Sequence, residues 1–184
     1  SLIQSGEISE HQDGGLIFGD LTVIPGSELE IYDEQSNGPI HLLMFFPNLT
    51  IMREFSSWLS GHLKNIQLSS QRIYVTGLVL QKKVKDLGGI FIPAHVFTPF
   101  KSLYGKGVNK SLTEVLNPDL IDGIELGLSS DTHMADQLGE LHKYTFVTNS
   151  DAHSLAKIAR EYQVMAMKEP TFLELQKALK GEDD

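Results

Sequence analysis

The sequence predicts an α/β protein in which a largely parallel sheet or barrel is flanked by helices. From about residue 40 onward, short apolar runs alternate with segments of helical spacing. Three of these runs end in residues that can bind metal, and the ends of parallel strands meet on one face. The chain has 184 residues, of which 41% are apolar and 21% charged, as in ordinary globular domains.

The first part of the chain is expected to be mostly strands. Residues 1–14 are polar and without a period, so they predict an irregular lead-in to a single domain over 15–184. Apolar or alternating runs predict the first four strands, at 16–18, 21–24, 28–32 and 40–46.

The second part is expected to alternate between helices and strands. Helical spacing predicts helices at 51–63 and 72–87, and Gly88-Gly89 marks the end of the second one. Capping-box spacing at Ser111 and Thr171 predicts one helix that stops before Pro118 and a last helix that ends near Gly181. A further helix is expected after Ser129 or Ser130, and strands are expected at 90–95, 121–126, 144–147 and 162–167.

Charge and cysteine content restrict the function classes. The net charge of −9 disfavours a general polyanion binder, although acidic residues gather near the two ends and the middle is more basic. The chain has no cysteine, so only His, Asp and Glu can serve as metal ligands. No run is long and apolar enough to span a membrane or to act as a signal peptide, so we expect a cytoplasmic protein without membrane contact.

Metal-ligand residues follow three successive predicted strands. His95 follows the run at 90–92, Glu125 follows 121–124, and Asp151 and His153 follow 146–147. A carboxylate oxygen and an imidazole nitrogen suit Zn, Mn or Fe better than Ca or Mg, although Mg could still support activity. Taken singly, Asp151 could cap a helix, His95 could begin a loop and Glu125 could form a salt bridge.

Two further candidates lie upstream, Glu28 in an alternating strand and His41 within an apolar run. His41 could instead be a core histidine bonded to a carbonyl group, and Glu28 or Glu30 an outward strand residue. Taken together, so many ligand types at one end of a sheet predict a metal site. More ligands than one ion needs indicate a phosphoesterase with two or three metal ions.

The segment 96–110 is a long loop that leaves the same strand end as His95. It places Lys101, Lys106 and Lys110 among Phe100 and Tyr104, a pattern that suits phosphate contacts and base stacking. A solvated loop without function is the alternative.

These motifs resemble the polymerase-and-histidinol-phosphatase (PHP) superfamily of metal-dependent phosphoesterases. The matching segments are Pro25-Gly26-Ser27-Glu28, His41, Pro93-Ala94-His95 and Asn149-Ser150-Asp151-Ala152-His153. The residues at 69–72, 91–105 and 148–160 are similar to those of the endonuclease Q group within that superfamily. The likeness covers nearly all of 16–181.

The resemblance implies a metal-dependent endonuclease of DNA repair that nicks DNA 5′ of deaminated bases or abasic sites. It implies metal ligation by Glu28, His41, His95, Asp151 and His153, with Glu125 as an outer or extra ligand. The resemblance further implies that catalysis depends on Asp151, His153 and Glu125. It also implies that damaged duplex DNA is contacted by Lys101, Tyr104, Lys106 and Lys110.

The chain departs from the family because it has neither a His-x-His motif nor the Cys-containing zinc module. We therefore expect an incomplete distorted β/α barrel that lacks its first strands and is weakly active or inactive alone. Its exposed edges could pair in a homodimer. The alternatives are a phosphatase for a small phosphomonoester and a non-catalytic structural or binding module.

Overall fold

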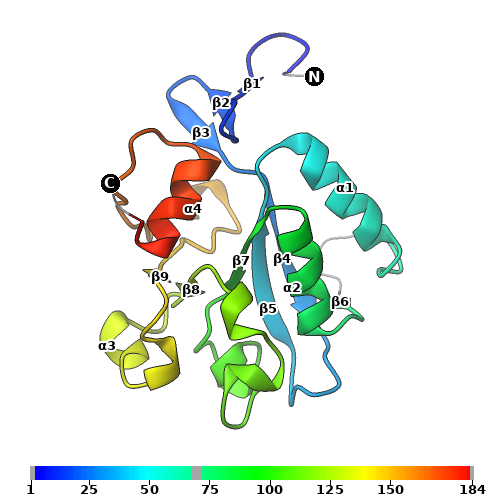
Figure 1. Cartoon of the computed structure of the whole chain (residues 1–184), viewed down its shortest axis with the longest axis vertical. Coiled ribbons are helices and arrows are strands. Elements are labelled where there is room, and N and C mark those ends of the chain that lie inside the picture. Colours follow the sequence, from blue (N-terminus) through cyan, green and yellow to red (C-terminus); the bar gives the residue numbers. More distant parts are fainter. Residues whose placement is uncertain (1–2, 68–71, 183–184) are drawn as a thin grey trace.

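A computed structural model describes residues 3–67 and 72–182, and the segment 69–71 of the expected family likeness lies outside the described residues. Figure 1 shows a mixed α/β arrangement in which helices α1 (Leu49–Ser60) and α2 (Gly77–Asp86) lie on the same side of a central sheet. The described residues form three open sheets with two, three and four strands.

The central sheet has the strand order β6-β4-β5-β7. Its strands are β4 (Gly26–Ile31), β5 (Ile40–Phe45), β6 (Arg72–Ile73) and β7 (Ile90–Pro93). Strand β5 pairs antiparallel with β4 and β7, while β6 pairs parallel with β4. Burial alternates along β5, with Ile40, Leu42 and Met44 fully buried on one face and His41 half-buried on the other.

Helices α1 (Leu49–Ser60) and α2 (Gly77–Asp86) cover the apolar face of this sheet. Asn48 caps α1 and Thr76 caps α2, each by accepting a backbone N–H of the first turn. Phe55 of α1 packs into the same buried cluster as the apolar residues of β5. The opposite face of the sheet is therefore free to carry the polar residues of β4 and β5.

The second half of the chain adds the parallel pair β8 (Ile124–Glu125) and β9 (Phe146–Val147). Backbone bonds from Asp122 N to Phe91 O (2.9 Å) and from Val96 N to Glu125 O (3.0 Å) place β8 beside β7. The remaining helical elements are η1 (Leu103–Gly107), η2 (Leu112–Glu114), η3 (Pro118–Leu120), α3 (Thr132–Ala135), η4 (Gly139–Leu141), η5 (Leu155–Lys157) and α4 (Phe172–Lys180). Over the described part of the chain, no helix combines the length and apolar character needed to cross a membrane.

A small antiparallel sheet near the N-terminus contains β1 (Ser9–Glu10), β2 (Leu16–Phe18) and β3 (Leu21–Val23). The expectation of a wholly irregular 1–14 is wrong at Ser9 and Glu10, which pair with Ile17 and Leu16. Polar strand residues without a period can still pair at an edge, so hydrophobic periodicity does not detect them.

The α/β class is confirmed, whereas the largely parallel sheet is not observed. The loop from Tyr32 to Pro39 returns the chain directly beside β4, and so short a connection forces antiparallel pairing. A closed barrel is likewise not seen among residues 3–67 and 72–182, where every sheet is open.

One predicted helix is confirmed with a later start, and one predicted strand is wrong. The helix expected over 72–87 begins only at Gly77, because Arg72 and Ile73 pair with Glu30 and Ile31 as strand β6. The strand expected over 162–167 is not formed, because this segment has no regular secondary structure, and Val164 is 89% exposed. An apolar run forms a strand only where a neighbouring strand can accept its hydrogen bonds.

The capping signals are confirmed. Ser111 and Glu114 form the reciprocal capping box, although the helix that follows is a single turn. Thr171 caps α4, and Gly181 ends it with a φ of 66°, in the left-handed region that favours glycine. The helix expected after Ser129 or Ser130 is present from Thr132, but its cap is the Asp131 side chain and neither of these two serines.

Candidate metal centre

Glu28, His41 and His95 form a cluster on the face of the central sheet opposite α1 and α2. One ligand atom from each residue lies within 4.8 Å of the others. Glu28 and Glu30 lie two positions apart on β4 and therefore share a face, and Glu30 is directly opposite His41 on β5. His95 enters from the loop that follows β7, the other neighbour of β5.

The contacts within the cluster suit a cation. His41 Nδ1 lies 2.7 Å from Glu28 Oε1 and 3.0 Å from His95 Nε2. A single ring nitrogen can donate only one proton, so one proton at His41 Nδ1 cannot fully satisfy both neighbours. One carboxylate oxygen and two imidazole nitrogens are ligands that Zn, Mn and Fe accept. The residues present therefore fit a divalent transition metal.

Glu125 lies behind His95. Its side chain is 6% exposed, and one oxygen accepts a hydrogen bond from the His95 backbone N–H (2.7 Å) and faces His95 Nδ1 (3.4 Å). The other oxygen accepts a hydrogen bond from Asn149 Nδ2 at 2.6 Å. Glu125 is thus placed to orient His95 from outside the three-residue cluster.

The electrostatics of the cluster favour a protonated His41 next to two ionised glutamates, Glu28 and Glu30. The hydrogen bond from His41 lowers the pKa of Glu28 despite partial burial. Burial raises the pKa of Glu30, but hydrogen bonds from Arg72 and His41 outweigh it and the net pKa is lowered. Burial opposes the charged form of His41, yet hydrogen bonds to Glu28 and Glu30 prevail and raise its pKa.

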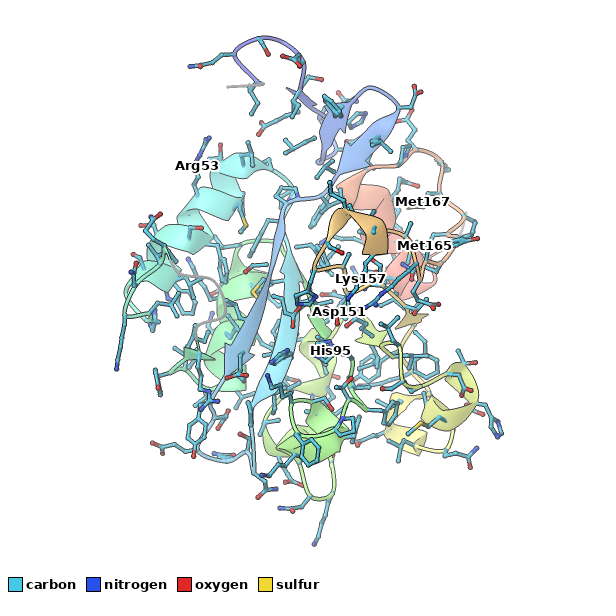
Figure 2. The ribbon with its side chains drawn as sticks, turned by 180° about the vertical axis from the view of Figure 1, so that it is seen from behind. Arg53, His95, Asp151, Lys157, Met165 and Met167 are labelled. Atoms are coloured by element: carbon cyan, nitrogen blue, oxygen red, sulfur yellow. The ribbon has the colours of Figure 1, made fainter. Side chains whose placement is uncertain are left out.

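A cleft of about 390 Å³ opens beside the cluster. The candidate residues that line it are Glu28, His41, His95, Lys101, Glu125, Asp151 and His153, together with Asn149 and Gly127. Figure 2 shows Asp151 next to His95 on this side of the molecule. The predicted strand-end residues of β7, β8 and β9 are therefore brought to one opening.

Asp151 and His153 line the cleft without joining the cluster of Glu28, His41 and His95. The His153 side chain is 80% exposed, and its Nδ1 lies 3.1 Å from the Asp151 carbonyl oxygen and 3.6 Å from Oδ1. Arg160 Nε donates to the Ser150 carbonyl oxygen at 2.7 Å and so braces this turn. The two residues form a second polar group at the lip of the cleft.

The backbone is strained at this cleft. His95 and Asp151 have φ values of 31° and 44°, which non-glycine residues rarely adopt. A Cβ on Gly127 would lie 2.6 Å from the His95 Cβ, so glycine is required for this close approach. Strain that the surrounding structure maintains is common at functional sites.

The candidate DNA-contacting residues of the loop after His95 differ in their distance from the cleft, and only some of them line it. Lys101 lines the cleft, whereas Lys106 lies against Gly38, away from the cleft. Tyr104 stacks on Phe97 with 5.5 Å between ring centroids, and its hydroxyl donates to Glu140 at 2.9 Å. Burial and the Glu140 carboxylate both raise the pKa of Tyr104. Lys110 is exposed at the far end of the loop.

Three residues around the cluster were not singled out as site residues from the sequence, namely Glu30, Arg72 and Asn149. Glu30 carries a signal, because in an alternating strand it shares a face with Glu28. Arg72 is in a segment that was predicted to be helical, so its pairing with β4 was not expected. Asn149 differs little from an ordinary turn residue in a single sequence.

The fold and the cluster together define an α/β protein with a histidine–carboxylate candidate metal site on one face of a mostly antiparallel central sheet. Two solved structures share this fold. One is the novel lesion-specific endonuclease PfuEndoQ from Pyrococcus furiosus, with a TM-score of 0.81 and 31% identity over 96% of this chain and 43% of that one. The other is endonuclease Q in complex with a 27-mer duplex substrate with an abasic lesion at the active site, with a TM-score of 0.83 and 30% identity over 98% of this chain and 44% of that one.

Two curated proteins are similar to this chain in sequence. The uncharacterized protein YqxK of Bacillus subtilis is 60% identical over 99% of this chain and 47% of its own length. The uncharacterized protein MJ0043 of Methanocaldococcus jannaschii is 34% identical over 59% of this chain and 15% of its own length. No family model matches the sequence. The chain spans less than half the length of these relatives and structures.

Proposed function

We propose that this chain is part of the metal-dependent phosphodiesterase domain of a DNA repair endonuclease that nicks DNA 5′ of deaminated bases or abasic sites. The observation that carries the proposal is the convergence of Glu28, His41 and His95 on one cleft in a chain with the fold of endonuclease Q. The structure of endonuclease Q with a duplex that carries an abasic lesion supports damaged DNA as the ligand class.

Glu28 Oε1, His41 Nδ1 and His95 Nε2 would hold one divalent ion, with Zn, Mn and Fe as the fitting candidates and Mg as a candidate activator. Such an ion would supply Lewis acidity for activating a water nucleophile and for neutralising phosphate charge. Glu125 would keep His95 oriented through the contacts to its backbone N–H and its Nδ1.

Asp151 and His153 would complete the centre from the lip of the cleft. In the complete domain we propose two or three ions, with the missing ligands contributed by parts of the longer protein outside this chain. Because His153 is exposed and its Nδ1 faces Asp151, its Nε2 is the atom that we assign to metal ligation in the complete centre.

Lys101 would contact a DNA phosphate, because it is a cation at the cleft rim beside the cluster. Lys106 and Lys110 would extend the positive track along the same loop. Tyr104 would hold that loop in place through Phe97 and Glu140, and base contact by Tyr104 stays a prediction. The 73% exposed Phe100, beside Lys101, is the aromatic side chain that we assign to base stacking.

A nicking assay tests the proposal. Labelled duplexes with one uracil, one hypoxanthine or one abasic site are incubated with Mn²⁺ and with a longer homologous protein, such as YqxK, that contains the counterpart of this chain. We expect a product that ends on the 5′ side of the lesion, and at least about 100-fold loss when the residue equivalent to His95 is replaced by Ala.

The isolated chain should turn over these duplexes far more slowly than the longer protein, because half-assembled ligands cannot align the attack on phosphorus. Equal cutting of undamaged duplex would argue against lesion specificity. Hydrolysis of a small phosphomonoester without nicking would favour the phosphatase alternative, and neither activity would favour the binding module.

A further inference from the structure

Glu30 lies on the far side of the His41 ring from the ligand cluster. It is paired directly with His41 across strands β4 and β5, and its Oε2 lies 3.2 Å from His41 Nε2. Glu28 Oε1 occupies the other side of the same ring, 2.7 Å from Nδ1. The imidazole is therefore held between two carboxylates, of which only Glu28 belongs to the candidate ligand set.

Arg72 fixes the Glu30 carboxylate. Its Nε donates to Glu30 Oε1 at 2.7 Å, which leaves Oε2 for His41. Arg72 and Glu30 are register partners in the parallel pair of β6 and β4, and the guanidinium lies 5.5 Å from the centre of the Tyr32 ring. Three adjacent strands thus build a chain of contacts from Arg72 through Glu30 to His41.

We propose that Glu30, held by Arg72, is a positioning residue that keeps the proton of His41 on Nε2 and presents Nδ1 to the metal. This inference rests on the proposed metal centre. Neutral imidazole carries a proton on one nitrogen only, so an acceptor at Nε2 selects the tautomer whose Nδ1 lone pair can bind a cation.

His95 is arranged in the same way. Its Nε2 points to the cluster, and its Nδ1 faces Glu125 Oε2 at 3.4 Å, while Asn149 holds the other Glu125 oxygen at 2.6 Å. Both histidines therefore have a carboxylate behind the ring, and each carboxylate is held by a donor from a different element. A repeated arrangement of this kind is expected where ring orientation matters.

The test compares zinc binding by the wild-type chain with that of Glu30→Ala and Glu30→Gln. Glu54→Ala is the matched control, because it removes a carboxylate that pairs with Lys83 at 3.3 Å on the other side of the sheet. Zinc affinity is measured by competition with a chelating dye. A ¹⁵N-histidine NMR spectrum of each zinc-loaded protein, assigned with His41→Asn, identifies the metal-bound nitrogen of His41.

We expect Glu30→Ala to bind zinc about 10- to 100-fold more weakly than wild type. Glu30→Gln should recover part of this loss, because its amide oxygen can still accept the Nε2 proton, and Glu54→Ala should bind like wild type. In the wild type, and in Glu30→Gln, His41 should be bound through Nδ1 and protonated at Nε2.

Unchanged zinc affinity in Glu30→Ala, no recovery in Glu30→Gln, or coordination of His41 through Nε2 would overturn the role of Glu30 while leaving the metal centre intact. If Glu30→Ala does not fold, as judged by melting without metal, the bound nitrogen in wild type and Glu30→Gln decides the question. A wild-type chain that binds no zinc would refute the metal centre itself, and this inference with it.

Discussion

At the scale of single residues, the contacts of His41 determine how the metal-free protein responds to pH. The pKa of Glu28 and of Glu30 is lowered from 4.5, so their contribution to stability is present above that value and is lost as pH falls through the lowered pKa. The pKa of His41 is raised from 6.5, so its contribution is present below that value and is lost as pH rises through the raised pKa.

We therefore expect this cluster to stabilise the metal-free chain most between pH 4.5 and 6.5. Thermal melting in the presence of a chelator, measured across pH, checks the prediction. His41→Asn should remove the decline on the alkaline side, and parallel profiles for the variant and the wild type would contradict it.

Substitutions at Phe100 test the strain of its backbone separately from the role of its aromatic ring. Its φ of 73° lies in the left-handed region, which costs a non-glycine residue roughly 1–2 kcal/mol. Phe100→Gly should therefore be more stable than Phe100→Ala by about 1 kcal/mol after the greater chain entropy of glycine is counted. Denaturant unfolding measures this difference, and a more stable Ala variant would contradict the strain.

Both Phe100 variants lack the ring, so both should bind a lesion duplex more weakly than wild type and to a similar extent. Fluorescence anisotropy with a labelled duplex measures the binding. If Phe100→Gly binds like wild type, Phe100 does not stack on a base.

At the scale of elements, Asp122 connects α2, β7 and the segment before β8. Its carboxylate pairs with Lys85 Nζ at 2.7 Å and accepts the Phe91 backbone N–H at 2.7 Å. Since its side chain is only 9% exposed, Asp122→Ala leaves a poorly hydrated cation and an unpaired N–H, at a cost of about 3 kcal/mol.

Chemical denaturation compares Asp122→Ala with Asp86→Ala as the control. Asp86 also pairs with a lysine, Lys82, but the pair is exposed and should cost under about 1 kcal/mol. Similar losses in the two variants would show that Asp122 does not hold β7 and β8 together.

The elements also show what a single sequence can predict. Strands β4, β5 and β7 and helices α1 and α4 were predicted because alternation, helical spacing and caps are local signals. The position of His95, Glu125 and Asp151 at one cleft followed from the rule that parallel strand ends meet. Strand β6 was not predicted because its two residues pair with a strand more than 40 positions away in the sequence. Whether strands pair parallel or antiparallel likewise depends on contacts between distant residues.

At the scale of the whole molecule, the described part of the chain carries one compact candidate cluster and a second polar group at the rim of the same cleft. Glu28 and His41 lie on neighbouring strands of one sheet and His95 closely follows a third, whereas Asp151 and His153 lie beyond the end of β9. This difference predicts that Glu28, His41 and His95 can bind one ion in the isolated chain without Asp151 and His153. Further ions would need ligands from the longer protein that we propose.

Crystals grown with Zn²⁺, measured above and below the zinc absorption edge, test the metal centre most directly. We predict an anomalous peak about 2.0–2.2 Å from Glu28 Oε1, His41 Nδ1 and His95 Nε2, which should disappear in His95→Ala. Zinc bound elsewhere, or no peak between these three atoms at saturating zinc, would contradict the assignment of this cleft as a metal centre.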